Sequence, residues 1–293
     1  MTHAQKQERN GWLFVSPWVV GFIGFLAYPV VASLYYSFCD YSVLKKPVFT
    51  GFDNFIQLAH DEVFWTSLKN TAYFSVFFLP LSLIVTLGLA MLLNAKVRGM
   101  AFYRTIFYLP SLVPMVATAV LFLWVFNAEH GLVNGLFASV GINGPGWLTD
   151  PAWTKFTIIL LSLWGAGNTM IIYLAGLQEV PQSLYEAAEI DGARAWQKTK
   201  AVTLPMISPV ILFNMVMGII GAIQMFTAPF IMFPSGTPAH STYFFAAYLY
   251  DSAFRFHNMG YACAMGWIMF VLILVLTLLS MRLSEKHVYY GGS

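Results

Sequence analysis

The chain has 293 residues, of which 58% are hydrophobic and only 10% are charged, with a formal net charge of +2. Its mean hydropathy is +0.68, whereas about a quarter of the residues in a soluble domain are charged. This composition excludes a water-soluble enzyme and a disordered chain, and so small a net charge gives no reason to expect a nucleic acid partner. The two cysteines, Cys39 and Cys263, allow no disulfide framework and no cysteine-based metal site. We therefore expect an integral membrane protein in a lipid bilayer.

Six stretches have the roughly 20 apolar residues that a helix needs to cross the hydrocarbon core. The first follows a charged start and has no clear cleavage site, so a retained helix is favoured over a signal peptide. The prediction is an all-α membrane protein with a permease domain over 12–282, an N-terminal segment over 1–11 and a C-terminal tail over 283–293. The predicted spans are 12–38, 71–95, 101–127, 156–177, 206–233 and 261–281.

The distribution of basic residues predicts how the chain crosses the membrane. With six spans and both termini in the cytoplasm, twice as many basic residues lie inside as outside, as the positive-inside rule requires. The inside set is Lys6, Arg9, Lys96, Arg98, Arg104, Arg194, Lys198, Lys200, Arg282 and Lys286, and the outside set is Lys45, Lys46, Lys69, Lys155 and Arg255. Both termini are therefore expected in the cytoplasm.

Ionisable side chains are almost absent from the predicted spans. The exception is Arg104, one turn from the cytoplasmic end, where its charge can reach the interface. Proton-driven and sodium-driven carriers usually keep ionisable groups at mid-depth, and many channels have charged selectivity rings. The composition of the spans thus disfavours both classes and suggests that the driving energy enters elsewhere.

The spans carry uncharged polar and aromatic residues instead, a set that suits a path for a neutral, polyhydroxylated solute such as a sugar. The alternative is that the amides bond neighbouring helices and the glycines allow close packing. The candidate path residues are Trp164, Asn168, Asn214, Gly218, Gly221, Gln224 and Phe226.

The predicted cytoplasmic loop 178–205 carries the most specific signal. Ser183 and Glu186 have the spacing of a capping box, with Ser183 as the N-cap of a short helix that runs to about Asp191. Gly192 is suited to the left-handed conformation that ends such a helix, and a second helix is expected from Ala193 to about Thr203.

A helix of about eight residues is too short to be stable alone, so the first loop helix must dock on something. Small residues at Ala187, Ala188 and Gly192 permit a close approach of a partner protein. Leu184, Tyr185 and Trp196 are expected to give that partner apolar area. The alternative is a helix on the bilayer surface, which three nearby acidic residues disfavour.

The loop resembles the EAA loop of the permeases of ABC importers. The resemblance rests on Glu186-Ala187-Ala188, on Asp191-Gly192-Ala193, and on Val202-Thr203-Leu204-Pro205 after the family's spacing, with Val202 where the family has Ile. The residues that it implies for ATPase coupling are Ser183, Leu184, Tyr185, Glu186, Ala187, Ala188, Asp191, Gly192, Leu204 and Pro205.

Further motifs extend the resemblance to carbohydrate-uptake permeases of the MalF type, related to the maltose, lactose and glycerol-3-phosphate systems. They are Ser16-Pro17-Trp18, Tyr28-Pro29, Gly51-Phe52-Asp53-Asn54-Phe55, Tyr103-Arg104, Leu109-Pro110, Leu174-Ala175-Gly176-Leu177-Gln178 and Gly260-Tyr261-Ala262. The segment Pro234-Ser235-Gly236-Thr237-Pro238 departs from the Gly-Gly-Pro that relatives often have.

The resemblance implies a type I ABC importer permease fold and a set of partners. These are a second, MalG-like permease, two ATP-binding cassette ATPases that hold ATP and magnesium, and an extracytoplasmic solute-binding protein that delivers the sugar. The helix near Ser183 is then the coupling helix, with Glu186 facing a basic group on the ATPase as well as capping its own helix. The implied location is the bacterial or archaeal cytoplasmic membrane, which is the inner membrane in a Gram-negative cell.

The chain itself is expected to hold no cofactor and to be no enzyme. It has no G-x-x-x-x-G-K-[ST] phosphate loop, and it lacks the paired carboxylates, histidine clusters and nucleophile elbow that hydrolytic chemistry needs. An ion-coupled secondary carrier of a neutral polar solute remains the alternative function. The absence of charge in the spans favours a neutral disaccharide or short oligosaccharide over an anionic sugar.

Overall fold

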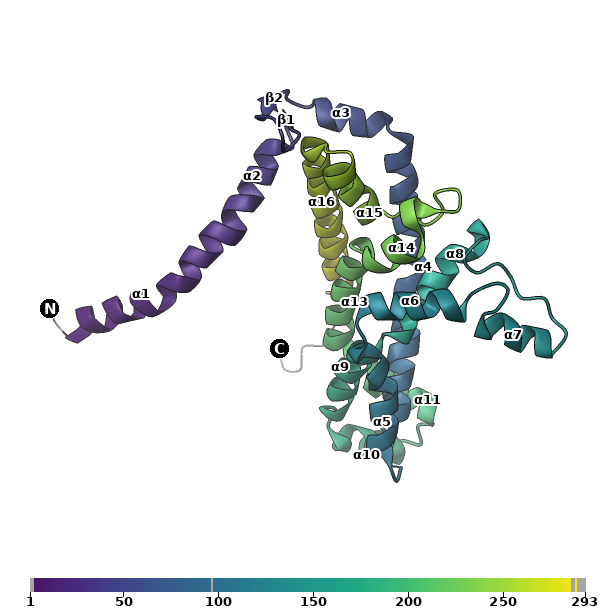
Figure 1. Cartoon of the computed structure of the whole chain (residues 1–293). Helices are drawn as coiled ribbons and strands as arrows, with labels where there is room; N and C mark the ends of the chain where they lie inside the picture. Colours follow the sequence, from purple (N-terminus) through teal and green to yellow (C-terminus); the bar gives the residue numbers. More distant parts are fainter. Residues whose placement is uncertain (1–2, 96, 286–287, 289–293) are drawn as a thin grey trace. The chain divides into compact units, whose positions relative to one another are not determined.

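The computed structural model describes residues 3–95, 97–285 and 288, and the chain forms two units (Figure 1). The first unit comprises Met1–Asp61 and Leu249–Phe270, and the second comprises Glu62–Tyr248 and Val271–Ser293. The expected N-terminal segment and C-terminal tail lie partly outside the described residues, at 1–2, 286–287 and 289–293.

In the first unit, a long apolar helical run leads into a small β-hairpin. Its elements are α1 (His3–Phe22), the π-helical turn η1 (Ile23–Ala27), α2 (Tyr28–Tyr36), β1 (Cys39–Asp40), β2 (Val48–Phe49), α3 (Asp53–His60), the π-helical turn η5 (Asp251–Arg255) and the first part of α16 (Met259–Ser284). The strands pair antiparallel with Cys39 opposite Phe49.

The second unit is wholly helical. It contains α4 (Glu62–Leu93), α5 (Met100–Tyr108), the 3-10 turn η2 (Leu109–Leu112), α6 (Met115–Val125), α7 (Leu132–Ser139), α8 (Pro151–Trp164), α9 (Gly167–Gln178), α10 (Gln182–Ile190), α11 (Ala195–Lys198), the π-helical turn η3 (Thr199–Thr203), α12 (Leu204–Met206), α13 (Ser208–Ile223), α14 (Thr227–Met232) and the 3-10 turn η4 (Pro234–Gly236). Helix α15 (Phe245–Tyr250) continues from the second unit into the first.

Four helical runs in the described residues are long and apolar enough to cross a membrane, namely Asn10–Tyr36, Glu62–Leu93, Ser208–Met232 and Met259–Ser284. The other two predicted spans are bent pairs. The helices on either side of Val113 and Pro114 meet at 96°, and α8 and α9 meet at 48°. Pro114 has no backbone N–H and forces Val113 into an extended conformation, so the helix breaks there.

Helix α4 begins nine residues before the predicted span at Thr71. The added turns are rich in polar residues. A search for long apolar stretches excludes such residues from a span, although they can form a helix. Asn70 in these turns and Thr71, the first residue of the predicted span, bind the segment that leads into α15 and the first residue of α15. Asn70 donates from Nδ2 to the carbonyl oxygen of His240 at 2.7 Å, and Thr71 Oγ1 accepts the N–H of Phe245 at 2.9 Å.

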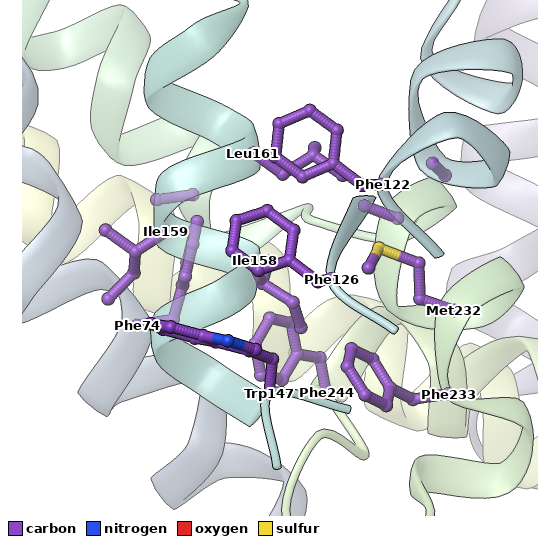
Figure 2. Packing of buried hydrophobic residues seen from close by; sticks show 13 residues of the cluster. Phe74, Phe122, Phe126, Trp147, Ile158, Ile159, Leu161, Met232, Phe233 and Phe244 are labelled. Carbon is purple, nitrogen blue, oxygen red and sulfur yellow. The ribbon is translucent and has the colours of Figure 1, made fainter. Parts of the chain in front are cut away.

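Aromatic side chains form the main core of the second unit (Figure 2). Phe74 of α4, Phe122 of α6 and Phe244 are buried together with Trp147, whose ring lies at 5.3 Å from that of Phe126. The core thus joins α4, α6, α8 and α14 across the bend after η2.

Asn54, from the Gly-Phe-Asp-Asn-Phe motif, organises the first unit. The side chain is buried, and Nδ2 donates to the carbonyl oxygens of Ser37 and Cys39, each at 2.9 Å. Gly51 has φ +69°, a conformation that favours glycine, and it leads the chain into α3. The motif therefore holds the end of α2 and the first strand against α3.

Replacing Asn54 with alanine should lower the free energy of unfolding by about 1–3 kcal/mol, because two carbonyl oxygens lose their buried donor. The thermal unfolding midpoint of the purified protein in detergent measures this. Gln57→Ala, on the exposed side of the same helix, is the matched control. Equal midpoints for the two variants would contradict the structural role of Asn54.

Arg104, in the middle of α5, binds the C-terminal end of α4. Its Nε and Nη2 donate to the carbonyl oxygen of Leu93, the last residue of α4, at 3.2 and 2.9 Å. A carbonyl at a helix C-terminus has no partner within its own helix and carries partial negative charge, so a guanidinium stabilises it. The residue therefore fixes the turn between α4 and α5 in addition to placing its charge near the end of a span.

Arg104→Ala should lower the free energy of unfolding by about 1–3 kcal/mol, since charged donors to a carbonyl are lost. Arg104→Lys should have an intermediate effect, because an ammonium group cannot reproduce the two-pronged contact. The exposed Arg98, replaced by alanine, is the control in the same thermal unfolding experiment. If Arg98→Ala is as destabilising as Arg104→Ala, the cap has no special role.

Candidate coupling loop and solute path

The loop between α9 and α13 forms two short helices at the end of the second unit where α5 begins (Figure 1). Helix α10 spans nine residues, and Gly192 follows it with φ +74°. The N–H of Ala193 donates to the carbonyl of Ala188 at 2.9 Å, which closes the helix end. The predicted position of α10, its end near Asp191 and the left-handed glycine are confirmed.

The predicted capping box is wrong. The N-cap of α10 is Pro181, with ψ 128°, and no side chain caps the helix. Ser183 is the second helical residue, and Glu186 is exposed without a capping hydrogen bond. Pro181 fixes the entry into the helix through its restricted φ, so the chain turns helical one residue before the serine.

The second loop helix also starts later than predicted. Arg194 is extended at ψ 163° and acts as the N-cap of α11, and its N–H donates to Gln197 Oε1 at 2.7 Å. From Ala195 the helix continues through η3 and α12 to Met206. The expected start at Ala193 missed this cap because Arg is not a typical N-cap residue.

The apolar side chains of the loop divide into an exposed set and an inward set. Trp196 is 71% exposed and Leu184 39%, as expected of a docking surface. Ile190, which the sequence analysis did not single out, is 87% exposed. Tyr185 is half-buried and packs on a buried cluster formed by α4 and α9, so most of its side chain is covered within this chain.

The last part of the motif also packs inward. Val202 and Leu204 contact the same cluster as Tyr185, and Pro205 is half-buried. The exposed members of the motif are Ser183, Leu184, Glu186, Ala187, Asp191 and Gly192, whereas Ala188 is half-buried. The motif therefore has one part that faces outward and one part that anchors the loop to the spans.

One ion pair lies within the loop. Lys198 Nζ donates to Glu189 Oε1 at 2.7 Å, and this hydrogen bond and the lysine's charge lower the pKa of the Glu189 carboxyl below its ordinary value. The carboxylate side chain is 63% exposed and that of the lysine 23%. The contact therefore favours the ionised form of the Glu189 carboxyl.

The seven candidate path residues do not share one environment. Asn214 and Gly218 line a cavity of about 530 Å³ between α4, α9 and α13. Asn214 Nδ2 donates to the carbonyl of Val210 in its own helix at 3.0 Å, and a Cβ at Gly218 would lie 2.9 Å from Leu79 Cδ2. Hydrogen bonding within a helix and close packing explain these two residues without a solute.

The other candidates are more open. Trp164, Asn168, Gly221 and Gln224 are exposed, and Phe226 is half-buried. Trp164 lies at the bend before α9, with its ring 5.8 Å from that of Phe122. Gly221 and Gln224 continue an exposed side of α13 that includes Phe213 and Met217. These exposed positions are available to a solute or to a partner subunit.

Comparison with known proteins places the chain in a family. Residues 79–288 match the model of the "binding-protein-dependent transport system inner membrane component" family. The chain is 39% identical over 290 residues to the probable ABC transporter permease protein YesP of Bacillus subtilis (strain 168), with 98% of this chain and 94% of the relative covered. It is also 39% identical to the lactose transport system permease protein LacF of Rhizobium radiobacter, with 95% of each covered.

Solved structures give the same assignment. A chain of a bacterial alginate ABC transporter, crystallised with a periplasmic protein bound to an alginate pentasaccharide, superposes with a TM-score of 0.84 at 26% identity, over 96% of both chains. The permeases that match are membrane transport proteins and not enzymes. This chain belongs to the family of binding-protein-dependent transport system inner membrane components.

Proposed function

We propose that this chain is a membrane-spanning permease subunit of an ATP-driven importer of sugars. Named relatives support the substrate class, since they include permeases for lactose and for arabino-oligosaccharides. In the proposed topology each bent pair is one span, which gives six spans with both termini in the cytoplasm. The location is the cytoplasmic membrane of a bacterium or archaeon.

The observation that carries the coupling role is a set of exposed apolar side chains on α10 and α11. Leu184, Ile190 and Trp196 expose apolar side chains on a short loop outside the candidate spans, where water would otherwise cover them. A nine-residue helix has little stability of its own, and a protein groove would supply the missing contacts. The partner is an ABC ATPase that binds ATP and magnesium.

In this proposal the ATPases move α10, and the spans alternate between inward-facing and outward-facing states. A second, MalG-like permease completes the solute path, and an extracytoplasmic binding protein delivers the sugar. Exposed Trp164, Asn168, Gly221 and Gln224 are the candidate path residues, since Asn214 and Gly218 already have packing roles. We expect a neutral disaccharide or short oligosaccharide, because Arg104 is the one ionisable residue in the six spans predicted from the sequence.

Reconstitution in liposomes separates this function from the alternative, an ion-coupled carrier. The complete complex and the chain alone are compared with labelled lactose, an arabino-oligosaccharide and an alginate oligosaccharide. We expect uptake by the complete complex with ATP and the binding protein, and none by the chain alone under a proton or sodium gradient. Gradient-driven uptake by the chain alone would overturn the proposal, and alginate as the best substrate would overturn the neutral sugar.

A further inference from the structure

Two side-chain contacts connect α10 to the helical segment that follows it. Lys198 Nζ bonds Glu189 Oε1 at 2.7 Å, and the hydroxyl of Tyr185 bonds that of Thr203 at 3.0 Å. Tyr185 and Glu189 are four residues apart, so they lie on the same side of α10. In the described part of the chain, these are the side-chain hydrogen bonds that link α10 to another element.

The partners of both contacts lie on one continuous helical segment. Lys198 ends α11 and Thr203 ends η3, and α12 follows without a break. The N–H of Ile207 bonds the carbonyl of Thr203 at 3.1 Å, and that of Ile211 bonds the carbonyl of Ile207 at 3.0 Å. These two hydrogen bonds therefore join the loop segment to α13, a candidate membrane span, across a local break at Ile207, where φ is −92° and ψ is 6°.

The connection on the other side of α10 has a different kind of contact. Helix α9 ends at Gln178, and three residues, the last of them the extended Pro181, precede α10. Among the described residues, no side-chain hydrogen bond joins α9 to α10. Tyr185 does touch the cluster that α9 helps to form, so contact with that helix exists as packing. The side-chain hydrogen bonds of α10, in contrast, join it to the helical segment that follows it in the chain.

We propose that the Glu189–Lys198 and Tyr185–Thr203 contacts form a latch that makes α10 and residues 195–206 move as one body, so that a displacement of α10 passes into α13. The four side chains are positioning residues, because they act through α10 and touch neither ATP nor solute. This inference rests on the proposed docking of α10 on an ATPase. It assigns the transmission of that movement to contacts inside this chain.

The exposed position of the ion pair sets the size of the expected effect. A pair at the surface contributes about 0–1 kcal/mol, and salt screens it. Breaking it should therefore detach α10 in part of the molecules rather than unfold the loop, while the half-buried Tyr185 continues to anchor the helix. A measurement of the distance between α10 and α13 detects such a partial release.

The test uses the complete transporter with spin labels on cysteines at Gln182 and Phe213, two exposed positions on α10 and α13. Electron paramagnetic resonance gives the distance distribution with and without ATP and orthovanadate. The latch predicts one narrow distance in both states. In Lys198→Glu and in Glu189→Lys the population at other distances should rise about two- to fivefold.

The double variant Glu189→Lys/Lys198→Glu restores the opposite charges and should recover the narrow distribution. Lys200→Glu changes the charge of a nearby exposed lysine and is the matched control. Thr203→Val and Tyr185→Phe test the hydroxyl pair separately and should also broaden the distribution. Single variants that match the control, or a double variant as broad as the single ones, would overturn the latch.

A crosslink between a cysteine at position 187 and the ATPase, measured in the same variants, separates failure of the latch from failure of the proposed function. If this crosslink forms and the distance distribution never changes among the variants, the latch alone is wrong. If the parent complex forms no crosslink, the docking of α10 is wrong, and the latch falls with it.

Discussion

Replacing Gly260 with alanine should prevent the first unit from folding correctly. A Cβ at this position would overlap the carbonyl oxygen of Cys39, and it would lie 3.2 Å from both the carbonyl oxygen of Tyr36 and the nitrogen of Tyr41. These are backbone atoms, which cannot move aside as the end of a side chain can. The N–H of Gly260 also donates to the carbonyl oxygen of Tyr41 at 3.0 Å. This hydrogen bond keeps the backbone at Gly260 close to residues 36–41.

We expect a loss of about 3 kcal/mol or more in the free energy of unfolding, the upper range for overpacking a buried site. The measurements are the yield of the assembled complex and its thermal unfolding midpoint in detergent. Gly266→Ala, two turns further along α16, is the matched control, since a Cβ there makes an ordinary contact of 3.8 Å with Leu249. A stable Gly260→Ala complex would show that this close approach does not exist.

Replacing Ala187 with tryptophan should strongly reduce sugar uptake without unfolding the chain. Ala187 is exposed on α10, so a larger side chain fits within this subunit. In the proposed complex the same position lies in a groove of the ATPase, where a bulky ring would push the two proteins apart. Overpacking typically costs 1–3 kcal/mol, so we expect sugar uptake to fall by about tenfold or more.

Uptake by reconstituted complexes and the thermal unfolding midpoint are measured together. Ala187→Ser keeps the volume of the side chain and should transport nearly as well as the parent. Normal uptake by the tryptophan variant would mean that this side of α10 does not meet the ATPase closely. A lowered unfolding midpoint would assign the loss to folding instead.

The sequence predicted the class of the protein and the positions of most helices, because the overall composition and the length of each apolar stretch determine both. It did not predict the 96° bend after η2, since a proline in an apolar run is compatible with either a kink or a break. It placed the start of α4 too late because the residues from Glu62 to Asn70 are largely polar, and the partner of Asn70 at His240 is far along the chain. Such long-range hydrogen bonds have no signal in a single sequence.

The candidate site was predictable to the level of the segment. The spacing of residues located α10 and the turn at Gly192. The N-cap, however, depends on the extended backbone conformation of Pro181 after α9, which the sequence did not predict. Whether Tyr185 faces a partner or its own core depends on tertiary packing, so an aromatic residue in a short helix could be assigned either way. For the same reason, Ile190 was missed as the most exposed apolar side chain of the loop.

The central claim is that α10 docks on an ATPase and moves with it. Disulfide crosslinking tests this most directly, with one cysteine at exposed Ala187 and the other in the groove of the ATPase of the same transporter. The native Cys39 is buried and Cys263 half-buried, and the parent without the added cysteines is the control. Docking of α10 predicts a crosslink whose yield changes when ATP is added. An intact complex that forms no crosslink at this position would contradict it.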